Sequence, residues 1–313
     1  MPHSIRRIPT TGSVLCLILF LAGVLHAATV TWDGSSSSDW SVGANWDTGT
    51  APGSGDVVVL TGSGFAPTNQ NIPTLDVEYI NHLDSLPSGT TISGNPINFT
   101  NQTWDSTSSS TRTITYKNDI KINIGGFGFT SHDSDDTVNI DGVLSGSDTL
   151  RNNDRGTIAL RNLNNTFTGG YKHSNSQFQF FGDGSIGAVP GSATSDFFSG
   201  GGGTSLNEFS RLEGDNGVYD INANRGWQVG SNDNMDFNVD AQQKVIFNGV
   251  ISQSDPGTSQ PGGIIKSDDG EFALTGTNTF EGNISVDDGV LTLDNANASG
   301  SADASAELDL NGG

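Results

Sequence analysis

Two stretches of this chain, more than a hundred residues apart, carry nearly the same local sequence. Residues 142–145 (GVLS) match residues 249–252 (GVIS) at an offset of 107, and residues 165–169 (NTFTG) match residues 278–282 (NTFEG) at an offset of 113. The difference of six residues is a net insertion around 258–263 (TSQPGG). Solenoids accept such insertions because they fall in surface loops and leave the stack of repeats intact. The repeat therefore favours a solenoid over a β-sandwich.

Apolar residues alternate with polar ones over short segments, and Gly, Asn, Asp and Ser separate these segments. The alternating pairs include Ile114 and Tyr116, Ile158 and Leu160, Phe178 and Phe180, and Phe272 and Leu274. A period of two is typical of β-strands, and the separating residues are those that tolerate turns. We therefore expect an all-β chain with almost no helix.

Three pairs of residues are expected to have the same role in each copy of the repeat. They are Asn165 and Asn278, Phe167 and Phe280, and Gly169 and Gly282. The phenylalanines are expected to point into the core, where each coil packs on the next. The asparagines are expected at corners, in the left-handed conformation and with the amide bonded to turn backbone. The glycines are expected where a side chain would clash.

The unit around the second copy resembles the autotransporter-associated β-strand repeat. The resemblance is carried by GVIS, LTGTNTFEGN and GVLTL within 247–295, by a weaker copy near 140–187, and by the opening at 29–60. It implies a right-handed, single-stranded parallel β-helix (β-solenoid) over residues 63–313, with an N-terminal capping region at 28–62. It also implies an exported protein of passenger or extracellular-matrix type. Neither a translocator region nor a sorting tail follows the last repeat, so we expect a fragment that stops within a repeat.

Residues 1–27 have the layout of a secretory signal peptide. Arg6 and Arg7 precede the apolar run 14–25, and small residues follow, with cleavage expected after Ala27. An apolar run of 12 residues is shorter than the roughly 20 that span a bilayer, although an uncleaved anchor stays open as an alternative. The expected location is therefore extracellular or associated with the outer membrane.

The mature chain would lack cysteine, because Cys16 is the only one and leaves with the signal peptide. It must therefore be stabilised by a buried core, without disulfides. Loss of Arg6 and Arg7 takes the formal charge from −22 to −24. Such a surface repels nucleic acid and anionic lipid, so we expect no nucleic-acid partner and no membrane insertion of the mature segment.

Trp32, Trp40 and Trp46 fall within fifteen residues of one another. If exposed, their rings would form a platform for stacking on sugars, and a carbohydrate-binding module is one alternative function. The favoured interpretation is a cap that closes the open apolar end of the solenoid.

Other motifs favour structural interpretations over chemistry. The segment 182–187 (GDGSIG) matches G-x-G-x-x-G, but Pro190 excludes the helix that a dinucleotide site needs, so no cofactor is expected. The segment 125–130 (GGFGFT) lacks the Asp of a calcium-binding repeat, while 131–136 (SHDSDD) and 268–269 (DD) are expected to be solvated turns, with calcium as the alternative.

The remaining candidates for chemistry are three histidines and one basic cluster. His82, His132 and His173 lack the spacing of metal ligands, so no metal site is expected. Arg151, Arg155, Arg161 and Lys172 form the only local enrichment of basic residues, and would serve a polysaccharide lyase or glycosidase built on a β-helix. We expect instead a non-catalytic, structural or adhesive surface-display segment, with extracellular glycans or cell-surface components as partners.

Overall fold

The computed structural model describes most of the chain after the predicted signal peptide. The described residues are 27–100, 103–106, 111–123, 127–131, 136–152, 156–174, 176–200, 203–210, 217–294, 297, 299–300 and 308–310. The signal peptide lies outside them apart from Ala27, as do His132, Arg155 and most of the segment 131–136.

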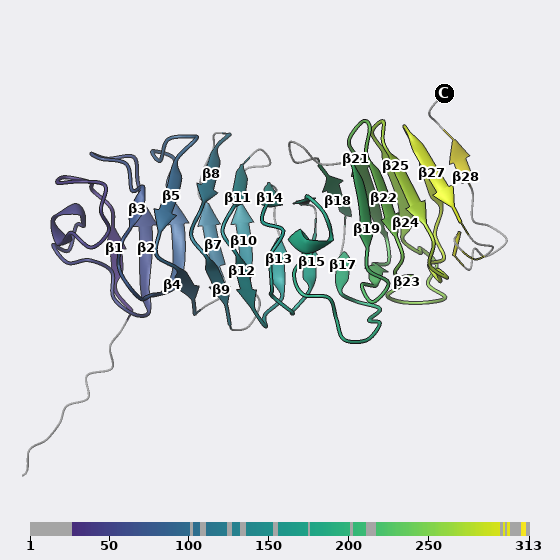
Figure 1. Cartoon of the computed structure of the whole chain (residues 1–313), viewed down its shortest axis with the longest axis horizontal. Coiled ribbons are helices and arrows are strands. Elements are labelled where there is room, and N and C mark those ends of the chain that lie inside the picture. Colours follow the sequence, from purple (N-terminus) through teal and green to yellow (C-terminus); the bar gives the residue numbers. More distant parts are fainter. Residues whose placement is uncertain are drawn as a thin grey trace, which may run out of the picture.

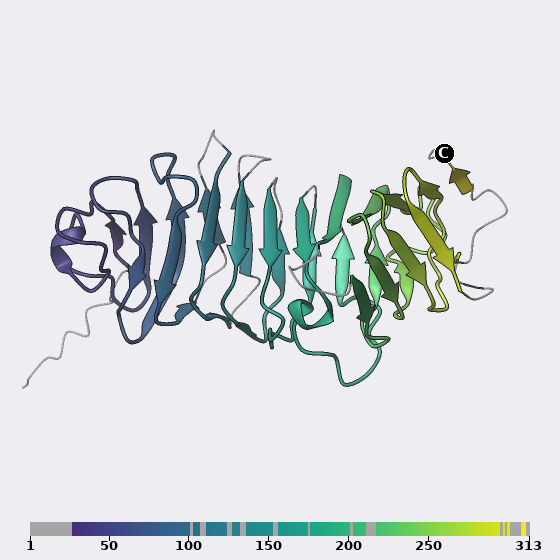
Figure 2. The same cartoon turned by 45° about the horizontal axis from the view of Figure 1, so that its top comes forward.

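The described residues form a β-solenoid of about 9 turns, which confirms the fold class predicted from the repeat. The coils follow one another along the long axis of the molecule, from the N-terminal to the C-terminal end (Figures 1 and 2). All pairings between named strands are parallel, and the described helix is limited to two short 3₁₀ segments, η1 (Gly43–Asn45) and η2 (Asp183–Ile186). Parallel pairing follows from coiling, since each coil repeats the direction of the one before.

Two long sheets run along the described part of the solenoid, and a third, shorter sheet lies in its C-terminal part. The first contains β1 (Thr29–Thr31), β2 (Asp56–Leu60), β4 (Leu75–His82), β6 (Ile97–Phe99), β7 (Thr103–Ser106), β9 (Ile120–Ile122), β10 (Phe127–Ser131), β12 (Leu144–Gly146), β13 (Leu150–Asn152), β15 (Tyr171–His173), β17 (Phe198–Gly200), β20 (Trp227–Val229) and β23 (Ile251–Gln253). The second contains β3 (Asn69–Gln70), β5 (Thr91–Gly94), β8 (Thr113–Tyr116), β11 (Thr137–Ile140), β14 (Thr157–Leu160), β16 (Gln177–Phe180), β18 (Gly203–Phe209), β21 (Asp233–Val239), β24 (Gly263–Ser267), β26 (Ile284–Val286) and β28 (Leu308–Leu310). The third contains β19 (Val218–Ile221), β22 (Lys244–Phe247), β25 (Glu271–Leu274) and β27 (Val290–Leu293).

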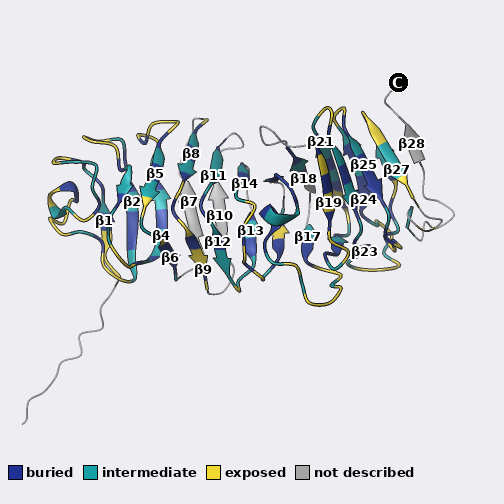
Figure 3. Ribbon diagram, viewed as in Figure 1, coloured by how far each residue is buried: buried dark blue, intermediate teal, exposed yellow. Residues whose placement is uncertain are grey.

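The core consists of columns of apolar side chains, in which each residue lies above its register partner in the previous coil. One column of the second sheet is fully buried and comprises Ile92, Tyr116, Ile140, Leu160, Phe180, Phe209 and Val239. Figure 3 shows buried residues alternating with more exposed ones along the strands. Because burial contributes roughly 25 cal/mol per Å² of apolar area, each coil stabilises its neighbours.

The first sheet carries an aromatic column in the middle of the solenoid. Tyr171 stacks on Phe198 with 5.1 Å between ring centroids, and Phe198 stacks on Trp227 at 4.0 Å. These three residues are register partners on β15, β17 and β20. Parallel in-register pairing places like positions above one another, so aromatic rings at one position stack.

Coil length varies along the chain, and this variation shapes the surface. From β14 to β16 the register advances 20 residues, since Thr157 lies opposite Gln177. From β16 to β18 it advances 29, since Gln177 lies opposite Leu206. The additional residues lie around η2 and in the segment that leads into β17. This longer coil builds one wall of the pocket described below.

Candidate functional site

The two copies of the repeat have equivalent surroundings in the structure. Phe167 and Phe280 are both fully buried, as expected for inward anchors. A glycine with positive φ packs against each: a Cβ at Gly187 would lie 2.6 Å from the carbonyl oxygen of Phe167, and one at Gly300 would lie 2.5 Å from that of Phe280. The equivalence therefore extends beyond the NTFxG residues into the following coil.

The repeated asparagines connect successive coils. Asn165 is 5% exposed, and its Oδ1 accepts a hydrogen bond from the Leu144 backbone N–H at 2.8 Å, while its Nδ2 donates to the Ser185 carbonyl at 2.8 Å. The Oδ1 of Asn278 accepts from the Ile251 N–H at 2.8 Å in the same way. The amides bond to backbone, but the partners lie in neighbouring coils and not in the local turn where they were predicted.

The left-handed conformation predicted for Asn165 and Asn278 is wrong. The described non-glycine residues with positive φ are Asn232, Gln242 and Asp268. The physical reason is that each repeated asparagine bonds to the backbone of a neighbouring coil, so its role does not require a tight local turn.

The repeated glycines lie where neighbouring backbone passes too closely for a side chain. A Cβ at Gly169 would meet the Asp148 carbonyl oxygen at 2.0 Å, and one at Gly282 would meet that of Gly262 at 2.1 Å. Both clash with backbone of the preceding coil, which confirms the expected reason for glycine at these positions.

The three N-terminal tryptophans are buried at the start of the core. Trp32, Trp40 and Trp46 are 1%, 0% and 2% exposed, and Trp46 makes edge contacts with Trp32 at 5.0 Å and with Trp40 at 5.8 Å. The Trp32 indole N–H donates to the Phe65 carbonyl at 2.7 Å. Stacking on a sugar requires an exposed ring face, and these rings do not offer one.

The described histidines lie inside the solenoid. His82 Nε2 lies 2.6 Å from the Tyr116 hydroxyl, and burial together with the charge of Arg112 lowers the pKa of His82 to about 3. Burial also lowers the pKa of His173 to about 4. Both rings are therefore neutral at ordinary pH. Among the described residues, no group of three or more His, Cys, Asp or Glu side chains is arranged to hold a metal ion.

The acidic segments that suggested calcium have other partners in the structure. Asp136 forms a buried ion pair with Arg112 at 3.1 Å. In the turn at 268–269, the ammonium of Lys266, which is buried, donates to the carbonyl oxygens of Asp268 at 2.7 Å and Asp288 at 3.3 Å. A cationic side chain thus already contacts the carbonyl oxygens of these turns.

The basic cluster predicted from sequence is only partly brought together. Arg151 on β13 and Lys172 on β15 are register partners, so the two cations lie on adjacent strands. Arg161 follows β14 in another sheet and pairs with Asp141 at 3.5 Å. Arg155 lies outside the described residues.

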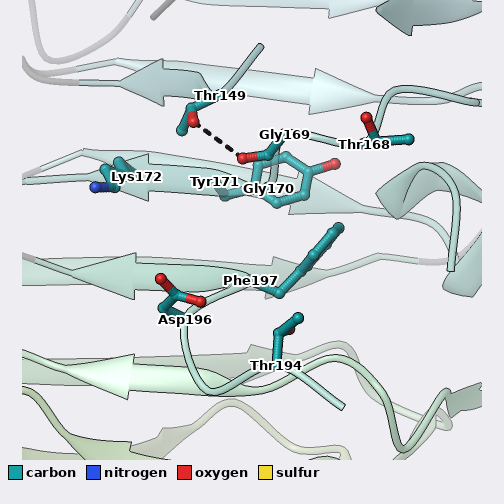
Figure 4. Close-up of a pocket in the computed structure, with 9 residues that line it drawn as sticks. All are labelled: Thr149, Thr168, Gly169, Gly170, Tyr171, Lys172, Thr194, Asp196 and Phe197. Atoms are coloured by element: carbon teal, nitrogen blue, oxygen red, sulfur yellow. Dashed lines mark hydrogen bonds between the residues drawn. The ribbon is translucent and has the colours of Figure 1, made fainter. Parts of the chain in front are cut away.

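Lys172 lies beside a small surface pocket formed by three successive coils. The pocket has a volume of about 210 Å³ and is lined by Thr149, Thr168, Lys172, Thr194, Asp196 and Phe197, together with the intervening glycines and Tyr171. Figure 4 shows these residues on successive strands and on the loop that contains Thr194 and Asp196. This pocket is the candidate functional site.

Arg225 holds the wall of the pocket in place. Its guanidinium is fully buried, donates to Asp183 Oδ1 at 2.8 Å and to the Gly187 carbonyl at 2.7 Å, and lies 4.9 Å from the ring centroid of Phe197. Thr194 donates to the Asn224 carbonyl from both its backbone N–H and its hydroxyl, each at 3.1 Å. The wall is therefore attached to the following coil by several contacts.

Sequence reasoning missed Arg225, Asp196 and the threonines of the pocket. One signal could have identified Arg225. Basic residues are scarce, 13 in 313, so an arginine in a turn such as NANRGW (222–227) is a candidate for a specific role. No such signal marks the threonines, because Thr is common in turns and strands alike and their convergence depends on coil length.

The sequence matches no protein-family model, and comparison with curated proteins and with solved structures finds no significant match. The resemblance to the autotransporter-associated repeat therefore rests on the motifs of the chain itself. No helix in the described part of the chain has the length and apolar character needed to cross a membrane.

Proposed function

We propose that this chain is an exported, non-catalytic β-solenoid segment that serves as a structural or adhesive element displayed at the cell surface. The observation that carries the proposal is the side-chain bonding between coils, above all at Asn165, which links backbone groups of the coils before and after it. These links and the continuous core support a rigid rod without disulfides.

The composition supports export as the setting of this function. A charged, then apolar, then small-residue start is typical of a secretory signal. A strongly acidic surface resists aggregation and nonspecific contact with anionic surfaces. A rod of this kind is suited to holding a binding surface away from the cell.

A carbohydrate-active enzyme is the second candidate, favoured by one observation. Arg151 and Lys172 are register partners on adjacent parallel strands, and Lys172 lines the pocket together with Asp196. Polysaccharide cleavage would need an acid or base whose pKa is shifted toward the working pH. The carboxyl groups of Asp233 and Asp236 have raised pKa values, but both residues lie on β21 and do not line this pocket.

The test is expression of the full chain in a bacterial host. We expect an exported, protease-resistant protein whose first residue is Ala28, and beads coated with it should adhere to cells or extracellular matrix. Incubation with acidic and neutral polysaccharides should release no reducing or unsaturated sugars. Retention of the uncleaved chain in the cytoplasm, or sustained release of such sugars, would contradict the proposal.

A further inference from the structure

The hydrogen-bonding groups around the pocket are arranged to serve a ligand that both donates and accepts. The hydroxyl of Thr149 donates to the Gly169 carbonyl at 2.9 Å, and that of Thr194 donates to the Asn224 carbonyl at 3.1 Å. Each hydroxyl proton is therefore committed to backbone, and each oxygen keeps lone pairs with which to accept. At these two positions the pocket presents acceptors.

Two charged groups border the same pocket. Lys172 and Asp196 are exposed, and within the described residues neither the ammonium nor the carboxylate is occupied by a hydrogen bond or an ion pair. The ammonium offers donors only and the carboxylate accepts only. A ligand in this pocket must therefore offer both acceptors and donors.

This arrangement excludes simple ions as the best ligand. A small anion would find one ammonium but also a carboxylate and hydroxyl oxygens that have no proton to give. A metal cation would meet the Lys172 ammonium beside the carboxylate. A polyhydroxylated ligand satisfies both kinds of group, because each of its hydroxyls donates and accepts.

The volume of the pocket limits the size of the ligand that it can hold. Its volume of about 210 Å³ lies below the roughly 300–1,000 Å³ of pockets that enclose drug-sized molecules, which suits a single ring. Phe197 closes the bottom of the pocket but is only 5% exposed, so recognition depends on the polar groups. The hydroxyl edge of a sugar ring can meet these groups.

We propose that the pocket between β13, β15 and the 194–197 loop binds one neutral hexose unit of a glycan, with Lys172 and Asp196 as the hydrogen-bonding pair. This inference rests on the proposed function, because it names the partner class of an adhesive rod.

The experiment measures binding of neutral and acidic oligosaccharides to the mature protein, first on a glycan array and then by calorimetry with the best neutral ligand. We expect neutral ligands to bind, and Asp196→Asn and Lys172→Met each to weaken binding about tenfold or more. Lys121→Met is the matched control, because Lys121 also occupies the exposed middle position of a three-residue strand, β9. It should leave affinity unchanged.

Hydrogen exchange of the wild type gives a second measurement that depends on no variant. Saturation with the neutral ligand should slow exchange at 168–172 and 194–197. The proposal would be overturned if no neutral oligosaccharide bound, or if acidic glycans bound more tightly than neutral ones. It would also be overturned if Lys121→Met weakened binding as much as the two pocket variants. A protein that is exported and adhesive but binds no neutral glycan contradicts only the pocket, whereas cleavage of a bound glycan contradicts only the non-catalytic function.

Discussion

At the scale of single residues, the buried side-chain amides at the coil junctions form hydrogen bonds to backbone that apolar side chains cannot form. Loss of the Asn165 side chain would leave the Leu144 N–H and the Ser185 carbonyl without their amide partner in a buried place. Buried polar groups that lose a partner cost about 1–3 kcal/mol each. The solenoid therefore depends on these asparagines to hold neighbouring coils together.

We predict that Asn165→Ala lowers the free energy of unfolding by about 2–4 kcal/mol. Urea denaturation followed by circular dichroism measures the change. Asn164→Ala is the control, since Asn164 is the exposed neighbour in the same turn, and it should change stability by about 0.5 kcal/mol or less. Equal effects of the two variants would show that the links between coils are unimportant.

Asp233 makes the stability of the native state depend on pH. Asp233 is 2% exposed, and burial, partly opposed by a hydrogen bond from the Asn234 backbone, raises its pKa from 3.8 to about 7. A carboxyl group whose pKa is higher in the folded state stabilises the fold while it is protonated. That stabilisation is complete below pH 3.8 and is lost as pH rises to about 7.

We predict that Asp233→Asn removes this dependence. Relative to wild type, the free energy of unfolding of the variant should rise by about 4 kcal/mol between pH 4 and pH 8, because an amide stays neutral throughout. Thermal unfolding across that range measures the difference. Asp255→Asn, which changes an exposed residue of the neighbouring loop, should follow the wild-type curve. A constant offset between the Asp233 variant and wild type would contradict the prediction.

At the scale of elements, the 3₁₀ segment η2 and the loop after it depend on one arginine from the next coil. Arg225 reaches groups 38 to 42 residues earlier in the chain. Because its guanidinium is fully buried, removing it leaves buried acceptors unpaired. The pocket wall is thus positioned by a residue that does not line the pocket.

We predict that Arg225→Met costs about 3 kcal/mol of stability and increases hydrogen exchange across 183–197. Arg161→Met is the matched control, because Arg161 also has a carboxylate partner and a nearby aromatic ring, but is 41% exposed. Surface pairs contribute about 1 kcal/mol or less, so this control should have little effect. Similar losses in both variants would argue against a special role for Arg225.

The fold was predictable because its signal is local and repeated. Alternation of period two at pairs such as Phe178 and Phe180 predicts strands, and recurrence of NTFxG predicts stacked coils. Asp196 and Arg225 were not predictable as parts of one site. Their proximity depends on how many residues each coil contains, and coil length is set by loops whose sequences carry no periodic signal.

At the scale of the whole molecule, a narrow rod carries a large negative charge. The chain has 35 Asp and Glu residues against 13 Lys and Arg, and predicted cleavage makes the formal charge −24. Parallel stacking repeats turns such as 268–269 and 287–288 in successive coils, which brings carboxylates close together. Self-repulsion of this kind destabilises a compact state and is screened by salt.

We therefore predict that the midpoint of thermal unfolding rises by about 5 °C between 10 and 300 mM NaCl, because the Debye length falls from about 30 Å to below 8 Å over that range. Calcium provides the control that separates screening from a specific site. At equal ionic strength, CaCl₂ and MgCl₂ should give the same midpoint if the acidic turns only repel one another. A midpoint that rises with submillimolar CaCl₂ but not with MgCl₂ would require a calcium site, since diffuse screening does not distinguish the two ions.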